Sequence, residues 1–430
     1  MSDPLKIAVA GLGTIGAGTL KLLHENASLL ELRSGRRLAL VGVSDLDRQK
    51  DRGVSLDGVR WYSDALEMAT QSEADVVVEL IGGSDGIAKQ VCEAAITANK
   101  HVVTANKALI AHHGTGLAVA AEAAGVQLAF EAAVAGGIPI IKSLREGLAA
   151  NRFSRVYGIL NGTCNYILSA MRENGREFSE VLKEAQELGY AEADPTFDVD
   201  GVDTAHKLAI LASLAFGCNV NFEAVHVEGI RHVSLMDIRF AEELGYHIKL
   251  LGMASLTDEG VEQRVHPCMV PVSAPIAHVE GVYNAVVAAG DFVDTIMQEG
   301  RGAGAGPTAS AVVADIADIA RGNRVPAFSV PAKDLKNLAP SPMNHHMGEY
   351  YIRLMVVDRP GVFAEVAAVL RDNDISMEQV LQRGRDPGEA VPVVMTIHET
   401  REQRMSIALK EIGGLESVIE PPRMIRIESL

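Results

Sequence analysis

Residues 5–18 read LKIAVAGLGTIGAG, a short apolar run followed by three spaced glycines. Gly11, Gly13 and Gly16 match the pattern G-x-G-x-x-G, and the residues before it favour a strand while those after it favour a helix. In that setting the first glycine permits a tight turn, the second lets the backbone approach a pyrophosphate, and the third lets the helix pack on the strand. The stretch predicts a dinucleotide site at a helix N-terminus, with Thr14 and Ile15 completing it.

The N-terminal third of the chain alternates strand and helix patterns. The runs RRLALVGVSD, ADVVVELIG and KHVVTANK are typical of strands, and QVCEAAITAN and LAVAAEAAG are typical of helices. Strands that alternate with helices form a parallel sheet with helices on both faces. The fold class is therefore α/β and Rossmann-like here, and we expect a dinucleotide-binding domain over residues 1–140.

The second strand of this domain ends at Asp45. An acid there can bond a ribose 2′-hydroxyl and favours NAD, although a simple turn aspartate explains it equally well. Arg48 follows closely and could accept a 2′-phosphate instead. The sequence therefore leaves both NAD and NADP open as the cofactor.

The rest of the chain divides into further units. Residues 141–306 mix helical and strand-like runs, which predicts an α+β domain, and PTASAVVADIADIARGN at 307–323 predicts an amphipathic helix. Prolines are frequent over 324–348, as in a linker. Residues 349–430 follow the order strand, helix, strand, strand, helix, strand, which is the ferredoxin-like pattern.

Composition excludes several classes of partner. The net charge of −17 would repel phosphate backbones, so we expect no nucleic-acid partner. We expect no membrane either, because no apolar run approaches the ~20 residues of a membrane span and the start has no signal-peptide pattern. The four cysteines are scattered, which together with these features predicts a cytoplasmic protein.

The stretch GYAEADPTFDVDGVDTAHK at 189–207 gathers five carboxylates before one lysine and an apolar helix. Lys207 falls in the early turns of that helix, where the dipole disfavours a cation. Asp203 precedes it by four residues, so the two side chains share a face and can pair. Burial and a paired acid together can tune a lysine for proton transfer, although an ordinary ion pair at the helix start is the alternative.

Two other features of this region point to a ligand. Glu192 and Asp203 are the best candidates for holding a cationic group such as an α-ammonium, and Asp200 is a candidate N-cap. Thr104 and Lys107 lie at the end of an expected parallel strand, where open α/β sheets bind ligands. A random surface lysine is the alternative for Lys107.

The spacing from Ala185 to Lys207, A-x3-GYA-x2-DP-x2-DV-x-G-x-D-x3-K, resembles the signature of homoserine dehydrogenases. The likeness extends to GLGTIG, to TANK at 104–107, EAAVAGGIP at 131–139, NGTCNYI at 161–167 and GRGAGAGPTAS at 300–310. The C-terminal part resembles an ACT domain, an amino-acid-sensing module. The resemblance implies reversible NAD- or NADP-dependent oxidation of L-homoserine to L-aspartate 4-semialdehyde in threonine, methionine and isoleucine biosynthesis.

The resemblance also implies roles for particular residues. It makes Lys207 the general acid/base, Lys107 a second lysine at the reacting oxygen, and Glu192 and Asp203 the substrate-holding acids. It makes 141–306 the substrate, catalytic and dimerisation domain, and places helix 307–323 back on the dinucleotide domain. The whole set of implied cofactor residues is Gly11, Gly13, Thr14, Ile15, Gly16, Asp45, Thr104, Lys107 and Gly306.

Two further sites follow only from the resemblance. A monovalent cation, expected to be Na⁺, would be held at Glu131, Val134, Gly136 and Ile138. In the ACT-like part, an amino-acid effector would be held by Asp358, Gly361 and Asn373, and pathway logic makes threonine the expected effector. A homodimer or homotetramer is the expected assembly.

Two alternatives belong to different classes. An aspartate-semialdehyde dehydrogenase would act on the same metabolite, but it needs a reactive cysteine with a histidine base, and no cysteine here has an activating context. A non-catalytic cofactor-binding amino-acid sensor would not need Lys107, Asp203 and Lys207. The first alternative also leaves the pattern at 185–207 unexplained.

Overall fold

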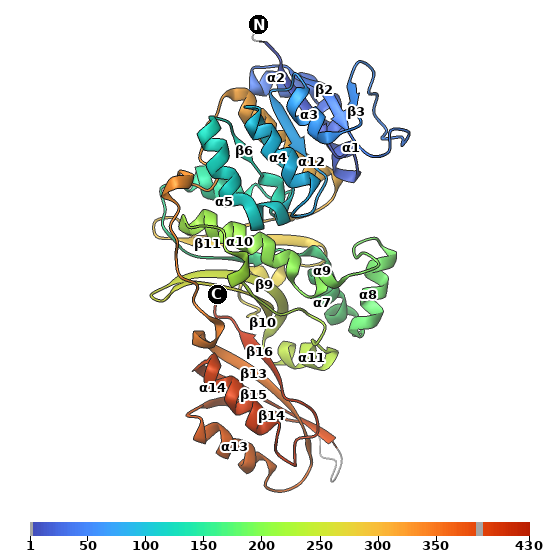
Figure 1. Cartoon of the computed structure of the whole chain (residues 1–430). Coiled ribbons are helices and arrows are strands. Elements are labelled where there is room, and N and C mark those ends of the chain that lie inside the picture. The colour runs from blue at the N-terminus through green and yellow to red at the C-terminus, as the bar shows by residue number, and fades with distance from the viewer. Residues whose placement is uncertain (1–2, 384–389) are drawn as a thin grey trace.

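The computed structural model describes residues 3–383 and 390–430, which form three units stacked along the length of the molecule (Figure 1). The N-terminus lies at the far end of the first unit, and the C-terminus emerges between the second and third units. No helix in these described ranges is long and apolar enough to cross a bilayer.

The first unit is built on a six-stranded parallel sheet with strand order β3-β2-β1-β4-β5-β6. Its strands are β1 (Leu5–Ala10), β2 (Leu38–Ser44), β3 (Arg60–Tyr62), β4 (Val76–Glu79), β5 (His101–Thr104) and β6 (Leu128–Ala129). Its helices are α1 (Thr14–Glu25), α2 (Ala27–Ser34), α3 (Ala65–Gln71), α4 (Ile87–Thr97) and α5 (Lys107–Ala124). The strand order reverses between β1 and β4, and such a switch point is where these sheets bind ligands.

Strand alternation explains why helices cover both faces of this sheet. In β1, Ile7 and Val9 pack into one apolar cluster and Ala8 and Ala10 into another, because successive side chains point to opposite faces. Both faces therefore need a cover. The predicted parallel, doubly covered sheet is confirmed.

Helix α12 (Ala305–Arg321) belongs in space to this first unit, although it follows the second in sequence. It packs along α1, and a Cβ placed at Gly18 would lie 3.1 Å from the Ala305 carbonyl oxygen. Val312 and Ile316 of α12 join the cluster that contains Ile7. The chain thus crosses back to the first unit before it enters the third.

The second unit is a helix-covered sheet. Its strands are β7 (Phe153–Ile159), β8 (His226–Val227), β9 (Tyr246–Thr257), β10 (Gly260–Pro271), β11 (Tyr283–Gly290) and β12 (Asp294–Arg301). Its helices are α6 (Ile140–Lys142), α7 (Gly162–Asn174), α8 (Phe178–Glu187), α9 (Thr196–Val199), α10 (Val202–Phe216) and α11 (Leu235–Glu243). Helix α10 is buried at every residue from Asp203 to Leu214, because it lies between α5 of the first unit and strands β7 and β9.

The third unit has the predicted ferredoxin-like order. Its elements are β13 (Met347–Val357), α13 (Val362–Asp372), β14 (Met377–Gln382), β15 (Ala390–Arg401), α14 (Glu402–Ile412) and β16 (Arg423–Ile427). The spatial order of its strands is β16-β13-β15-β14, all antiparallel. Tyr350, Ile352 and Leu354 of β13 form its core with the inward faces of the two helices.

The second and third units share one continuous ten-stranded sheet, which the sequence did not predict. Strand β16 pairs in parallel with β10 through Cys268 with Arg426 and Met269 with Ile427. One edge of the ACT-like sheet is therefore occupied by a strand of the same chain.

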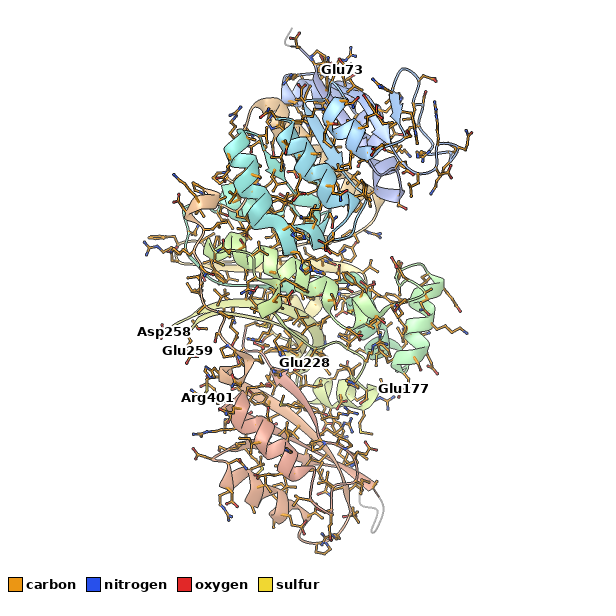
Figure 2. All side chains as sticks on the ribbon, in the orientation of Figure 1. Glu73, Glu177, Glu228, Asp258, Glu259 and Arg401 are labelled. Carbon is orange, nitrogen blue, oxygen red and sulfur yellow. The ribbon has the colours of Figure 1, made fainter. Side chains whose placement is uncertain are left out.

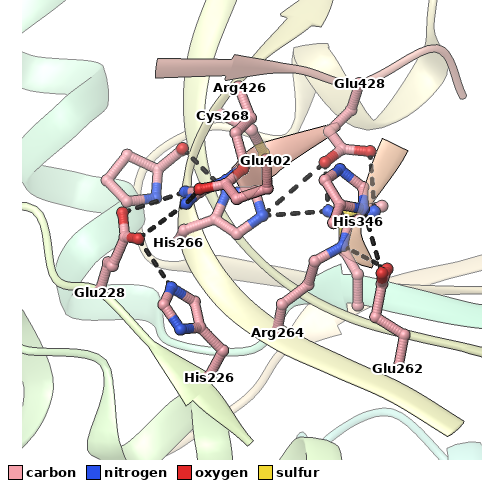
Figure 3. A network of polar contacts seen from close by, with 12 residues as sticks. His226, Glu228, Glu262, Arg264, His266, Cys268, His346, Glu402, Arg426 and Glu428 are labelled. Carbon is pink, nitrogen blue, oxygen red and sulfur yellow. Dashed lines mark hydrogen bonds and ion pairs between the residues drawn. The ribbon is translucent and has the colours of Figure 1, made fainter. Parts of the chain in front are cut away.

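A buried network of charged groups crosses this junction (Figure 3). Arg426 donates from Nε to Glu402 at 3.0 Å and from Nη2 to Glu228 at 2.9 Å. Arg264 of β10 pairs with Glu262 and with Glu428, which follows β16. Figure 2 shows Glu228 at the same junction. Because buried charges are tolerated only when they are paired, the network ties the position of the third unit to that of the second.

Candidate active site

A cavity of about 550 Å³ lies between the first and second units. Its lining includes Ile15, Lys107, Asn161, Glu192, Asp203 and Lys207. These residues come from the glycine loop, the start of α5, the start of α7, the segment before α9 and the first turns of α10. The fold therefore brings the dinucleotide loop and the acidic stretch to one hollow.

The glycine loop has the shape of a phosphate cradle. Gly11 has φ +90°, and a Cβ there would lie 2.6 Å from the Leu80 carbonyl oxygen, while a Cβ at Gly16 would overlap the carbonyl of Gly11. Gly13 has open space around it and precedes Thr14, the first residue of α1, with no side-chain cap on the helix. The uncapped amides at this helix start fit a pyrophosphate.

Asp45 follows β2, as predicted, but its carboxylate is already engaged. It accepts hydrogen bonds from the backbone amides of Leu12 and Asp47 and lies 3.5 Å from Arg52. Although burial alone would raise the pKa of Asp45, those two amides and the Arg52 guanidinium hold it below its ordinary value. The guanidinium carbons of Arg48 and Arg52 lie 5.9 and 5.4 Å from the ring centre of Trp61.

Two lysines meet on one carboxylate at the centre of the cavity. Lys207 Nζ lies 2.7 Å from Asp203 Oδ2, and Lys107 Nζ lies 3.1 Å from Asp203 Oδ1. Lys207 also donates to the Leu160 carbonyl oxygen at 2.7 Å. Burial alone would raise the pKa of the Asp203 carboxyl, but the two ammonium groups hold it far below its ordinary range. Asp203 is therefore a permanent carboxylate that fixes both lysines.

Asn161 is a site residue that our reading of the sequence missed. Its amide donates to Asp198 at 2.8 Å and to Asp203 at 2.9 Å, while its own oxygen caps α7 by accepting from Cys164. Burial, and then repulsion from Asp203, raise the pKa of the Asp198 carboxyl. The motif NGTCNYI contains Asn161, but nothing local in it indicates a partner about forty residues away.

The start of α10 differs from the prediction. Asp200 does not cap the helix: the N-cap is Gly201, with φ +86°, and Asp200 pairs with Arg231. A glycine is needed at 201 because the left-handed conformation disfavours other residues and because Val227 and Val265 crowd the position.

The remaining predicted cofactor and substrate residues divide into two groups. Glu192 lines the cavity and is exposed. Thr104 is fully buried, and its hydroxyl donates to Glu79 at 2.6 Å, so it supports the strand end and does not line the cavity. Gly306 lies at the exposed start of α12 outside the lining, whereas its neighbours Gly304 and Thr308 are part of it.

Glu131 begins a short, buried 3-10 helix, η1 (Glu131–Ala133), which leads into a tight turn. Its two oxygens accept amide hydrogens from Ile141 at 3.0 Å and Lys142 at 2.8 Å. Burial, followed by repulsion from Asp315, raises the pKa of Glu131 to about 8. Ala135, which lies between Val134 and Gly136, has φ +48°. This left-handed conformation turns the chain tightly just before Ile138. Within the described residues, no group of three or more His, Cys, Asp or Glu side chains could hold a metal, so carbonyl oxygens would have to supply the other ligands.

The predicted effector residues are only partly together. Asp358 and Gly361 line a cavity of about 290 Å³ at the start of α13, where Gly361 is the N-cap with φ +96°. Asn373 lies at the opposite end of the same helix, where it donates to Glu411 at 2.9 Å. A single chain therefore does not bring all three residues to one hollow.

The fold and this cavity define an NAD(P)-dependent oxidoreductase, because a dinucleotide loop faces two lysines held by one buried acid. The family model for homoserine dehydrogenase matches residues 139–317, that for its NAD binding domain matches 11–131, and that for the ACT domain matches 350–416. The chain belongs to the homoserine dehydrogenase family.

Full-length relatives agree with this assignment. The chain is 46% identical to a homoserine dehydrogenase of Neisseria gonorrhoeae, and 45% identical to one of Pseudomonas aeruginosa, each over 99% of both chains. It matches the crystal structure of a homoserine dehydrogenase from Thiobacillus denitrificans with a TM-score of 0.94 and 44% identity, covering 99% of this chain and 98% of that one. The predicted family, fold class and oxidoreductase activity on the CH–OH group of homoserine are confirmed, with an ACT domain at the C-terminus.

Proposed function

We propose that the cavity between the first two units interconverts L-homoserine and L-aspartate 4-semialdehyde, with Lys207 as the group that moves the proton. The Lys107–Asp203–Lys207 cluster carries this proposal, because it lies in the same cavity as Ile15 of the glycine loop. An ammonium has three N–H bonds, and within the described part of the chain Lys207 has acceptors for two of them. The third is available to a substrate oxygen.

The residues of the chain divide the remaining work. The nicotinamide cofactor, when bound in the glycine loop, supplies the hydride chemistry. In reduction the Lys207 ammonium gives a proton to the substrate oxygen and becomes a neutral amine, and in oxidation the neutral amine takes the hydroxyl proton of the substrate and becomes the ammonium. Lys107 stabilises negative charge on the same oxygen, and Glu192 with Asp203 binds the α-ammonium of the substrate. Asp203 keeps the two lysines in place throughout.

We propose NADP as the preferred cofactor. Asp45 would favour NAD through a ribose 2′-hydroxyl, but its oxygens are engaged by Leu12, Asp47 and Arg52. Arg48 brings its guanidinium group beside Trp61, close behind the end of β2, and such a group suits a 2′-phosphate, whereas the Arg52 guanidinium is buried and engaged by Asp45. Titrating the enzyme with each cofactor by fluorescence tests this, and equal or tighter binding of NAD⁺ would contradict it.

We propose that the loop around Glu131 holds a monovalent cation, with Na⁺ the expected ion. The Glu131 carboxyl is buried beside Asp315, which raises its pKa, and a cation bound there would stabilise its ionised form. The carboxylate of Glu131 and the carbonyls of Val134, Gly136 and Ile138 are oxygen donors, which hard cations prefer. The ion would hold this loop, and thereby the floor of the cavity, in shape.

We propose that the ACT domain binds an amino acid, with threonine the expected effector, at the cavity lined by Asp358 and Gly361. The amides at the start of α13 suit a carboxylate. Since Asn373 is at the other end of the helix, it would reach an effector only across a pair of ACT domains. Threonine should alter the rate of the intact enzyme, and a Gly361→Val variant should lose that response.

We propose a homodimer or homotetramer that works in the cytoplasm. The ten-stranded sheet ends at β12 and β14, and free sheet edges can pair between chains. Phe292, on the turn that leads into β12, is 89% exposed and offers an apolar contact. The four cysteines are free and buried, as expected in a reducing compartment.

One assay tests the proposed reaction. The purified enzyme, given L-homoserine with NADP⁺ or NAD⁺, should form reduced nicotinamide that is followed by its ultraviolet absorbance. A parallel sample receives aspartate semialdehyde and inorganic phosphate. If only the second sample turned over, and only with phosphate, the semialdehyde dehydrogenase alternative would be favoured. Turnover in neither would leave the chain a cofactor-binding sensor and contradict the proposal.

A further inference from the structure

Rings from four separate segments form a stack beside the two lysines. His206 of α10 stacks on Phe222, with ring centres 4.3 Å apart and an interplanar angle of 11°, and on Phe197 of α9, with ring centres 5.5 Å apart and an angle of 26°. His112 of α5 meets the edge of His206 at 5.3 Å, with the two Nε2 atoms 3.3 Å apart. None of these rings has a role in the reaction proposed above.

The outer ring of the stack meets the second lysine of the site. The Lys107 ammonium lies 5.6 Å from the centre of the Phe197 ring, which is within the range of a cation–π interaction. The same ammonium lies 3.1 Å from Asp203. The side chain of Lys107 is 34% exposed and has a flexible stem, so these two contacts decide where the ammonium lies.

His206 stacks against Phe197, and a neutral ring is suited to that place. It is 4% exposed, and its Nδ1 has no hydrogen-bond partner among the described residues. Burial above all, and then the nearby His112, lower the pKa of His206 to about 4. A neutral imidazole can stack between two aromatic rings without repelling the lysines nearby. The stack is therefore a rigid backing for Phe197.

We propose that Phe197, backed by His206 and Phe222, is a positioning residue that holds the Lys107 ammonium between its ring face and the Asp203 carboxylate. This inference depends on the role proposed for Lys107 at the substrate oxygen. Phe197 itself is 43% exposed, and it directly precedes Asp198, which lines the cavity.

A double-mutant cycle tests the proposal. Phe197→Leu should lower kcat for homoserine oxidation on the order of tenfold, while the Kd for NADP⁺ stays unchanged. In a Lys107→Met background, the same Phe197→Leu change should have little further effect, because the cation that it positions is absent. If Phe197→Leu lowered kcat equally in both backgrounds, the ring would act independently of Lys107 and the proposal would be wrong.

The chemistry of the ring gives a second readout that a purely structural role would not move. Phe197→Tyr should keep nearly full kcat, and successive ring fluorination of Phe197 should lower kcat stepwise at almost constant size. A flat response to fluorination would overturn the proposal.

The outcomes separate this inference from the role on which it depends. If Lys107→Met alone keeps the normal kcat, the role proposed for Lys107 fails. If Lys107→Met is slow but Phe197→Leu keeps the normal kcat, only the positioning role of Phe197 fails. Thermal unfolding and NADP⁺ binding of each variant show whether the protein is folded.

Discussion

Replacing Asp203 by asparagine should disable the site while leaving most of the fold intact. The change keeps the size of the side chain and removes the carboxylate that both lysines share. At an effective dielectric constant of about 20, the Coulomb attraction is about 6 kcal/mol for Lys207 at 2.7 Å and about 5 kcal/mol for Lys107 at 3.1 Å. These are gross values, and that for Lys107 is reduced further because its side chain is 34% exposed.

The net loss is smaller, because water and desolvation offset part of each attraction. Removing one partner of a buried ion pair costs about 3–5 kcal/mol. If most of that cost falls on the transition state, kcat/KM for homoserine drops by about 10²-fold or more. The KM for homoserine should also rise, since Asp203 is proposed to bind the α-ammonium.

The assay is steady-state oxidation of homoserine, with cofactor binding measured on the same samples. Asp194→Asn is the matched control: it makes the same change in the same acidic stretch, but Asp194 is exposed and accepts a hydrogen bond from the nearby backbone amide of Thr196. Asp203→Asn with kcat/KM within threefold of the unchanged enzyme, or Asp194→Asn with an equal loss, would refute the reasoning.

Three further outcomes are expected. Although burial alone would raise the pKa of Glu262, the His346 imidazole and the Arg264 guanidinium hold that pKa at about 2, against an ordinary value of 4.5. The ionised form of Glu262 therefore contributes about 3 kcal/mol to stability. This contribution is fully present above pH 4.5 and is lost as the pH falls towards 2. Thermal unfolding across that range should show the loss, and Glu262→Gln should flatten it; an unchanged slope in the variant would contradict this source. Arg426→Met leaves the Glu402 carboxylate buried without this partner and should lower the unfolding free energy by about 3–5 kcal/mol. Arg404→Met, which removes an exposed ion pair with Asp374 from α14, the helix that begins with Glu402, should cost under about 1 kcal/mol. Chemical denaturation compares the two variants, and equal losses would count against the network. A Cβ at Gly13 would meet no protein atom, so Gly13→Ala should keep the thermal midpoint of unfolding. The added methyl group would meet the pyrophosphate, so cofactor affinity measured by titration should fall about tenfold or more. Unchanged affinity would show that the glycine loop does not bind the pyrophosphate.

Local patterns were enough to predict the first unit and part of the site. The glycine spacing after β1 and the continuous apolar strands specify a parallel sheet without any long-range information. The pair of Asp203 and Lys207 follows from helix geometry alone, since residues four apart share a face. These features depend on interactions between residues that lie close together in the sequence.

Other features depend on where distant segments meet, and the sequence could not show them. Lys107 reaches Asp203 only because α5 and α10 pack together, and Asn161 bridges the acids from a third helix. The pairing of β16 with β10 involves a short stretch of backbone with no side-chain signature. Asp45 was correctly placed at a strand end, but the engagement of its carboxylate by Arg52 depends on the path of a surface loop.

The most direct measurement of the proposed proton transfer uses Lys207→Ala. The kcat for homoserine oxidation should fall by about 10²–10⁴-fold with NADP⁺ affinity unchanged, and added methylamine should restore part of the rate by entering the space left by the side chain. Lys107→Ala, measured alongside, should be slower than normal but should not respond to the amine in the same way. A Lys207→Ala enzyme that turns over homoserine at the normal rate, or an amine response confined to Lys107→Ala, would show that a different group carries the proton.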